Sequence, residues 1–74
     1  MSTVLDTIAA ARRQLDQYDP DLAVYMVRDL PETKAAGLTD LCWAMYHGSI
    51  VCSEARDVLD TLEAWVRQQE ASHQ

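Results

Sequence analysis

The chain has 74 residues, of which 49% are hydrophobic, and its 12 acidic side chains outnumber the 6 basic ones to give a formal net charge of −6. This length corresponds to one domain. Because nucleic-acid phosphates and anionic lipid headgroups repel such a chain, we expect neither direct nucleic-acid binding nor membrane binding. A basic or mixed surface on another protein is the natural electrostatic complement.

The first predicted helix covers residues 3–17. Its apolar side chains recur at intervals of four, three and four residues, at Val4, Ile8, Ala11 and Leu15. This spacing places them on one face of a helix. Asp6 lies in the first turn, where the positive end of the helix dipole favours a carboxylate.

The second predicted helix covers residues 20–29. Asp19 followed by Pro20 is typical of a helix start, with Asp as the N-cap and Pro at the first helical position. The continuous apolar run 22–27 fits either a buried strand or a helix that is apolar all round. The Asp-Pro start, and the absence of a second strand-like segment to pair with, favour the helix. Pro31 limits it.

The third and fourth predicted helices cover residues 32–47 and 51–69. Apolar side chains repeat with helical spacing in both, at Leu38, Leu41, Cys42 and Met45 and then at Val51, Ala55, Val58, Leu59, Leu62 and Val66. Gly37 lies inside the third helix and is expected to weaken it by about 1 kcal/mol relative to Ala. Gly48 ends that helix. The sequence therefore predicts an all-α domain of three to four helices, built on a C-terminal αα-hairpin.

The residues that could carry chemistry are few. The soft metal ligands are Cys42, His47, Cys52 and His73, and their spacing matches no zinc-site pattern. Neither cysteine has an adjacent activating histidine with an orienting carboxylate. We expect no catalytic residue, no metal and no cofactor. The N-terminus lacks the pattern of a signal peptide, which favours a cytoplasmic protein with reduced thiols.

The large aromatic side chains are all Trp or Tyr, with no Phe. Such a composition is typical of protein interfaces, because these rings combine an apolar body with a polar tip. The candidate partner-binding residues of this kind, taken with one methionine, are Tyr25, Met26, Trp43 and Tyr46. The alternative is that these side chains only cover the edges of a small core.

Acidic residues recur every third position in the last predicted helix, at Glu54, Asp57, Asp60 and Glu63. This spacing predicts an acidic stripe on the outer side of that helix. The stripe is either an ordinary solvated face or a strip of carboxylates that docks against a basic surface. All four residues are candidate partner-binding residues.

The apolar content is high for so short a chain, so either the core is unusually full or part of the apolar surface is buried against another chain, which we favour. For a homodimer, the predicted seam is the segment that is apolar all round, at Leu22, Tyr25 and Met26.

These features predict a small acidic interaction module that binds and regulates or inhibits a larger cytoplasmic protein. In size and charge alone, it is analogous to the accessory proteins and inhibitors of phages and mobile elements, and to anti-activators. Two alternatives stay open. One is a homodimeric structural or assembly subunit, and the other is an acidic mimic of nucleic acid that blocks a DNA- or RNA-binding protein.

Overall fold

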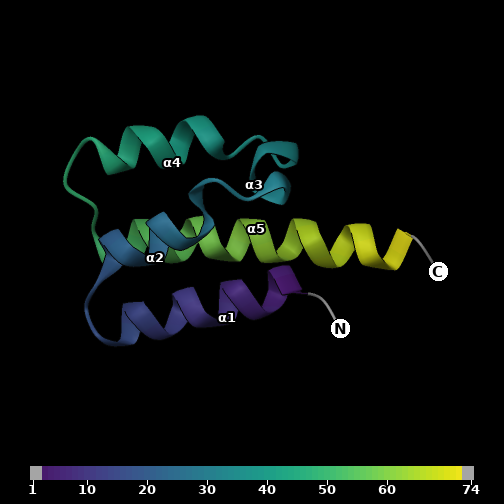
Figure 1. Ribbon diagram of the computed structural model, residues 1–74, viewed down its shortest axis with the longest axis horizontal. Coiled ribbons are helices and arrows are strands. Elements are labelled where there is room, and N and C mark those ends of the chain that lie inside the picture. Colours follow the sequence, from purple (N-terminus) through teal and green to yellow (C-terminus); the bar gives the residue numbers. More distant parts are fainter. Residues whose placement is uncertain (1–2, 73–74) are drawn as a thin grey trace.

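The computed structural model describes residues 3–72, which fold into five α-helices without a strand (Figure 1). The helices are α1 (Thr3–Asp16), α2 (Pro20–Arg28), α3 (Pro31–Ala35), α4 (Thr39–Tyr46) and α5 (Cys52–Ser72). The predicted all-α class is confirmed. The predicted helices 3–17, 20–29 and 51–69 correspond to α1, α2 and α5, with small differences at their ends.

Helix α1 ends in a Schellman motif whose left-handed residue is a tyrosine. The N–H of Asp19 donates to the carbonyl of Gln14 at 2.9 Å, and the N–H of Tyr18 donates to the carbonyl of Leu15 at 3.0 Å. Tyr18 has a φ of 58°, in a region that glycine occupies far more readily than other residues. The motif therefore carries backbone strain at Tyr18.

Helix α2 begins as the sequence predicts. The carboxylate of Asp19 accepts a hydrogen bond from the N–H of Leu22 at 3.1 Å, and Pro20 occupies the first turn. The apolar run 22–27 is helical throughout, and it buries Ala23, Val24 and Val27. The strand alternative for this run is wrong.

The prediction of one continuous helix over residues 32–47 is also wrong. The chain leaves helical geometry at Gly37, whose φ is +76°, and this break separates α3 from α4. The N–H of Leu38 donates to the carbonyl of Thr33, and the N–H of Gly37 donates to that of Lys34, both at 3.0 Å. Gly37 is thus the C′ glycine of a second Schellman motif rather than a weak position inside a helix.

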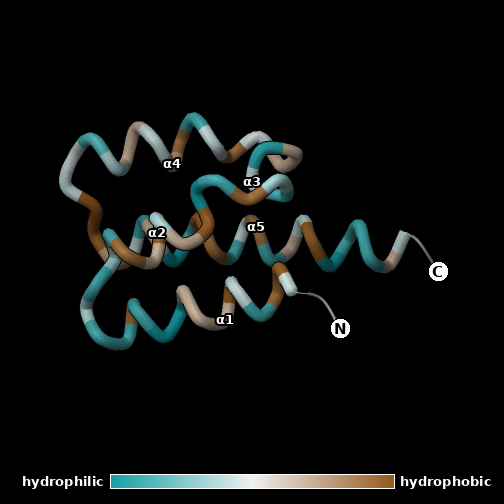
Figure 2. The backbone as a smooth tube through the Cα atoms, viewed as in Figure 1, coloured by the Kyte–Doolittle hydropathy of each residue, from teal (hydrophilic) through white to brown (hydrophobic). Residues whose placement is uncertain are grey.

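The core lies where α1, α2 and α5 meet. Its largest fully buried apolar side chains come from each of these helices, at Ile8, Val24, Val27, Leu59 and Leu62. Figure 2 shows apolar and polar residues alternating along α5, as expected for a helix with one buried face. Helix α1 packs most extensively on α2 and α5, whereas α4 packs mainly on α2.

A buried hydrogen bond holds α3 against the end of α2. Thr33 is fully buried, and its Oγ1 donates a hydrogen bond of 2.5 Å to the carbonyl of Val27. This bond satisfies a polar atom that would otherwise destabilise the interior. It also ties α3 to the end of α2.

Helices α4 and α5 run antiparallel and are joined by the short segment 47–51, which gives the course of the predicted hairpin (Figure 1). Because α4 packs mainly on α2, an open groove remains between α4 and α5.

Candidate interaction surfaces on either side of helix α4

The first surface is an aromatic cluster built around one arginine. Tyr25 of α2 and the α4 residues Trp43 and Tyr46 surround the guanidinium carbon of Arg28, which lies 5.0, 3.9 and 4.7 Å from the three ring centroids. We call these four residues the aromatic cluster. Tyr25 and Arg28 are three residues apart and therefore share a face of α2, as Trp43 and Tyr46 do on α4.

Arg28 is held tightly within this cluster. Its side chain is only 11% exposed, and one Nη atom pairs with Asp29 at 3.2 Å. The buried Nε has no hydrogen-bond partner among residues 3–72. The guanidinium therefore depends on the faces of the rings for much of its stabilisation, and cation–π contacts of this desolvated kind reach about 2 kcal/mol.

The rings of the cluster also contact one another. The ring centroids of Tyr25 and Tyr46 are 6.2 Å apart, and those of Trp43 and Tyr46 are 6.4 Å apart in an edge-on arrangement. Yet Tyr25, Trp43 and Tyr46 remain 52%, 38% and 40% exposed. The three rings therefore cover Arg28 while keeping part of their own surface exposed, and the Trp43 ring also stacks on that of His47, with the centroids 5.8 Å apart.

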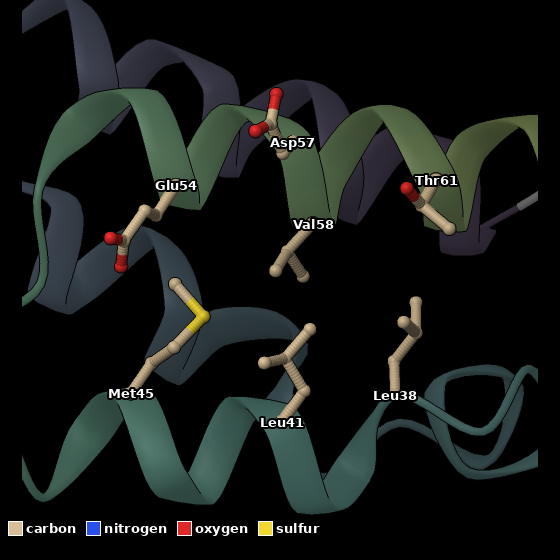
Figure 3. A pocket seen from close by; sticks show the side chains of 7 residues that line it. All are labelled: Leu38, Leu41, Met45, Glu54, Asp57, Val58 and Thr61. Carbon is tan, nitrogen blue, oxygen red and sulfur yellow. The ribbon is translucent and has the colours of Figure 1, made fainter.

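The second surface, which we call the acidic groove, lies between α4 and α5 and encloses a hollow of about 220 Å³. In Figure 3 the side chains of Leu38, Leu41 and Met45 point toward α5 across this hollow. Glu54 and Val58 point back toward them, whereas the carboxylate of Asp57 points away from the hollow and lies on its rim. Its lining residues are Leu38, Leu41, Met45, Glu54, Asp57, Val58 and Thr61. Leu38 and Val58 are buried, whereas Leu41 is 48% exposed.

The predicted acidic stripe divides into two pairs with different surroundings. Glu54 and Asp57 line the acidic groove and have no ion pair with any described residue. Asp60 and Glu63 lie farther along α5 and contact Arg12 of α1, at 2.7 and 2.9 Å. The four carboxylates therefore do not form one uniform strip.

Glu63 is the most constrained of these carboxylates. Its pKa lies below the ordinary range, first because Arg12 donates hydrogen bonds to it and then because Arg67 does so at 3.0 Å. Burial lowers the pKa of Arg12, but the hydrogen bonds that Arg12 donates to Asp60 and Glu63, with the attraction of their charges, outweigh this effect and raise that pKa overall. This ionic network links α1 to α5.

The predicted dimer seam is only partly exposed. Leu22 and Tyr25 are exposed beside a shallow hollow that Asp19, Asp21 and Tyr46 also line. Met26 instead packs, half-buried, against the core. Met26 therefore belongs neither to the aromatic cluster nor to the acidic groove, although it was predicted as a contact residue.

Sequence reasoning missed Arg28 as the centre of a site. A basic residue near the end of a helix is common, because it suits the negative end of the helix dipole. The available signal was the spacing of three residues from Tyr25, which places the guanidinium beside that ring.

The thiols do not form a shared site. Cys42 is fully buried and Cys52 is half-buried, and burial is the main cause that raises the pKa of the Cys42 thiol. Within residues 3–72, no group of three or more His, Cys, Asp or Glu side chains is arranged to hold a metal ion. His73 lies outside the described residues. Over the same range, no helix combines the length and apolarity required to cross a bilayer.

Comparison of the chain with protein-family models, with curated proteins and with solved structures finds no match.

Proposed function

We propose that this chain is an interaction module that binds a larger cytoplasmic protein through the acidic groove and so regulates or inhibits it. The observation that supports this most is the half-exposed Leu41 in a groove that the carboxylate of Glu54 enters and the carboxylate of Asp57 borders. Neither carboxylate forms an ion pair with a described residue. Apolar surface left open and bordered by charge is characteristic of protein-binding sites. An accessory role, of the kind that small inhibitors of phages and mobile elements have, fits such a module.

A homodimeric subunit is the second candidate, and a different surface favours it. Leu22 and Tyr25 expose apolar area on α2, away from the acidic groove. Two copies could bury these side chains against each other, although the charge of −6 on each copy opposes their approach.

Capture experiments with two matched variants separate these candidates. The tagged chain, its Leu41→Lys variant and its Leu22→Lys variant are each incubated with lysate of the source cells, and the bound proteins are compared by mass spectrometry. Both changes place a charge at an exposed apolar position, so circular dichroism should show the same helicity for all three chains. We expect Leu41→Lys to lose the partner and Leu22→Lys to retain it. Loss with Leu22→Lys alone would assign the contact to α2 and contradict the proposal.

A further inference from the structure

The chemistry of the acidic groove identifies the kind of segment that it accepts. We infer that its occupant is an amphipathic helix of the partner that inserts a large apolar side chain between α4 and α5 and places Lys or Arg beside Glu54 and Asp57. This inference rests on the proposed function, because it names the partner chemistry of the same groove.

The walls of the groove determine the length over which the docked segment can contact it. Leu38, Leu41 and Met45 line it from one side, and the first and last of them are seven residues apart, or about 10 Å at the helical rise. Glu54 and Thr61 are also seven residues apart on α5. A docked segment therefore meets the groove over about two turns of helix.

The size and lining of the hollow indicate an apolar anchor. A hollow of about 220 Å³ exceeds the roughly 150 Å³ cavity that binds benzene in another protein. It can therefore hold a side chain as large as Leu or Phe. Met45 lies on its wall, and the flexible thioether side chain can adapt to different anchors.

The backbone of the walls favours a helical occupant over an extended one. Both walls are helices, whose backbone N–H and C=O groups are already paired within each helix. An extended peptide in the groove would find no strand edge with which to pair, and would leave its own backbone groups unsatisfied. A helix satisfies these groups internally and can present apolar side chains at every third and fourth position.

Charge excludes a second copy of this chain as the favoured occupant. Glu54 and Asp57 lie one helical turn apart on the same wall, and no basic side chain in residues 3–72 forms an ion pair with either. The chain itself carries 12 acidic and 6 basic residues, so another copy would bring mostly repulsive charge. A basic segment would instead bring Lys or Arg to Glu54 inside the groove and to Asp57 on its rim.

Synthetic peptides test the inference directly. The probe is a fluorescent helical peptide of about 15 residues, long enough to retain some helicity, with Leu at positions i, i+3, i+4 and i+7 and Lys on its flanks. One matched peptide has Glu in place of every Lys, and another has Gln in place of every Leu. Affinity for the full chain is measured by fluorescence anisotropy at low and physiological salt.

We expect the Leu/Lys peptide to bind at least tenfold more tightly than either matched peptide, and more weakly as salt rises. The double variant Glu54→Gln/Asp57→Asn should weaken its binding about tenfold, and Leu41→Lys should abolish it. The control variant Asp16→Asn/Glu70→Gln removes the same charge from exposed positions outside the groove, and should change the affinity no more than about twofold.

Equal weakening by the two double variants, or equal binding of the Leu/Lys and Gln/Lys peptides, would show only general attraction to an acidic protein and would overturn the inference. Equal binding of the Glu peptide would also overturn it. If none of the peptides binds while Leu41→Lys still loses the captured partner, the inference fails and the proposed function stands.

Discussion

At the scale of single residues, Arg28 determines the order of the aromatic cluster. Its guanidinium lies 3.9 Å from the centroid of the Trp43 ring, in a position that a lysine ammonium cannot reproduce, because only the planar group stacks on several rings at once. Without the guanidinium, Tyr25 and Tyr46 would lose their cation–π contacts with Arg28.

We therefore expect Arg28→Lys to lower the free energy of unfolding by about 1 kcal/mol. Urea denaturation followed by circular dichroism measures this change. Arg56→Lys is the control, since Arg56 lies exposed on α5, and it should leave the urea midpoint unchanged. Equal midpoints for the two variants would mean that the cluster adds no stability.

At the scale of helices, the Schellman motif at Gly37 determines whether Gly37→Ala raises or lowers the stability of the protein. If Gly37 lay inside a helix, as the sequence predicts, Gly37→Ala would stabilise the protein. Because Gly37 has a φ of +76°, Gly37→Ala should instead lower the free energy of unfolding by about 1 kcal/mol. The backbone conformation alone causes this loss, since an added Cβ meets no atom within 4 Å.

Tyr18→Gly is the matched opposite change, because Tyr18 holds the equivalent left-handed position after α1. It should raise the free energy of unfolding by up to about 1 kcal/mol by removing backbone strain. Thermal denaturation of both variants measures the pair. An increase in melting temperature for Gly37→Ala would contradict the break between α3 and α4.

Three of the five helices could be predicted from the sequence, and the break between the other two could not. Helices α1, α2 and α5 could be predicted because local signals define them: a regular apolar face, or the Asp19-Pro20 start. The break at Gly37 could not, because the same glycine suits a weak helix interior or a C-cap, and the apolar spacing continues through Leu38 and Leu41.

The acidic groove could not be predicted from the sequence either. Helical spacing places Leu41, Cys42 and Met45 on one side of α4. That spacing predicts that this side is apolar, but not which neighbouring helix covers it. Cys42 is buried, while Leu41 stays half exposed, because α4 packs mainly on α2. Likewise, the pairing of Arg12 with Glu63 joins positions 51 residues apart, which no local pattern reveals.

At the scale of the whole molecule, the ionic network between α1 and α5 makes stability depend on pH. The folded state lowers the pKa of Glu63, so Glu63 binds a proton less readily there than in the unfolded chain. Its contribution is present above the ordinary Glu pKa of about 4.3 and is lost as pH falls through the lower folded pKa.

Glu63→Gln should therefore lower the free energy of unfolding at pH 7 by about 1 kcal/mol or less. The free energy of unfolding of this variant should also fall less steeply as the pH is lowered. Urea midpoints measured from pH 7 to pH 3 give both quantities. Glu70→Gln, at an exposed position on the same helix, should leave the profile unchanged. Identical profiles for the two variants would show that the network does not couple the helices.

Site-specific photo-cross-linking in the source cells shows whether the acidic groove is the surface that contacts a larger protein. A photoreactive amino acid replaces Leu41 in one chain and Leu22 in another. We expect a covalent adduct with a distinct, larger protein from position 41 and none from position 22. An adduct with a second copy of the chain from position 22, and no adduct from position 41, would contradict it.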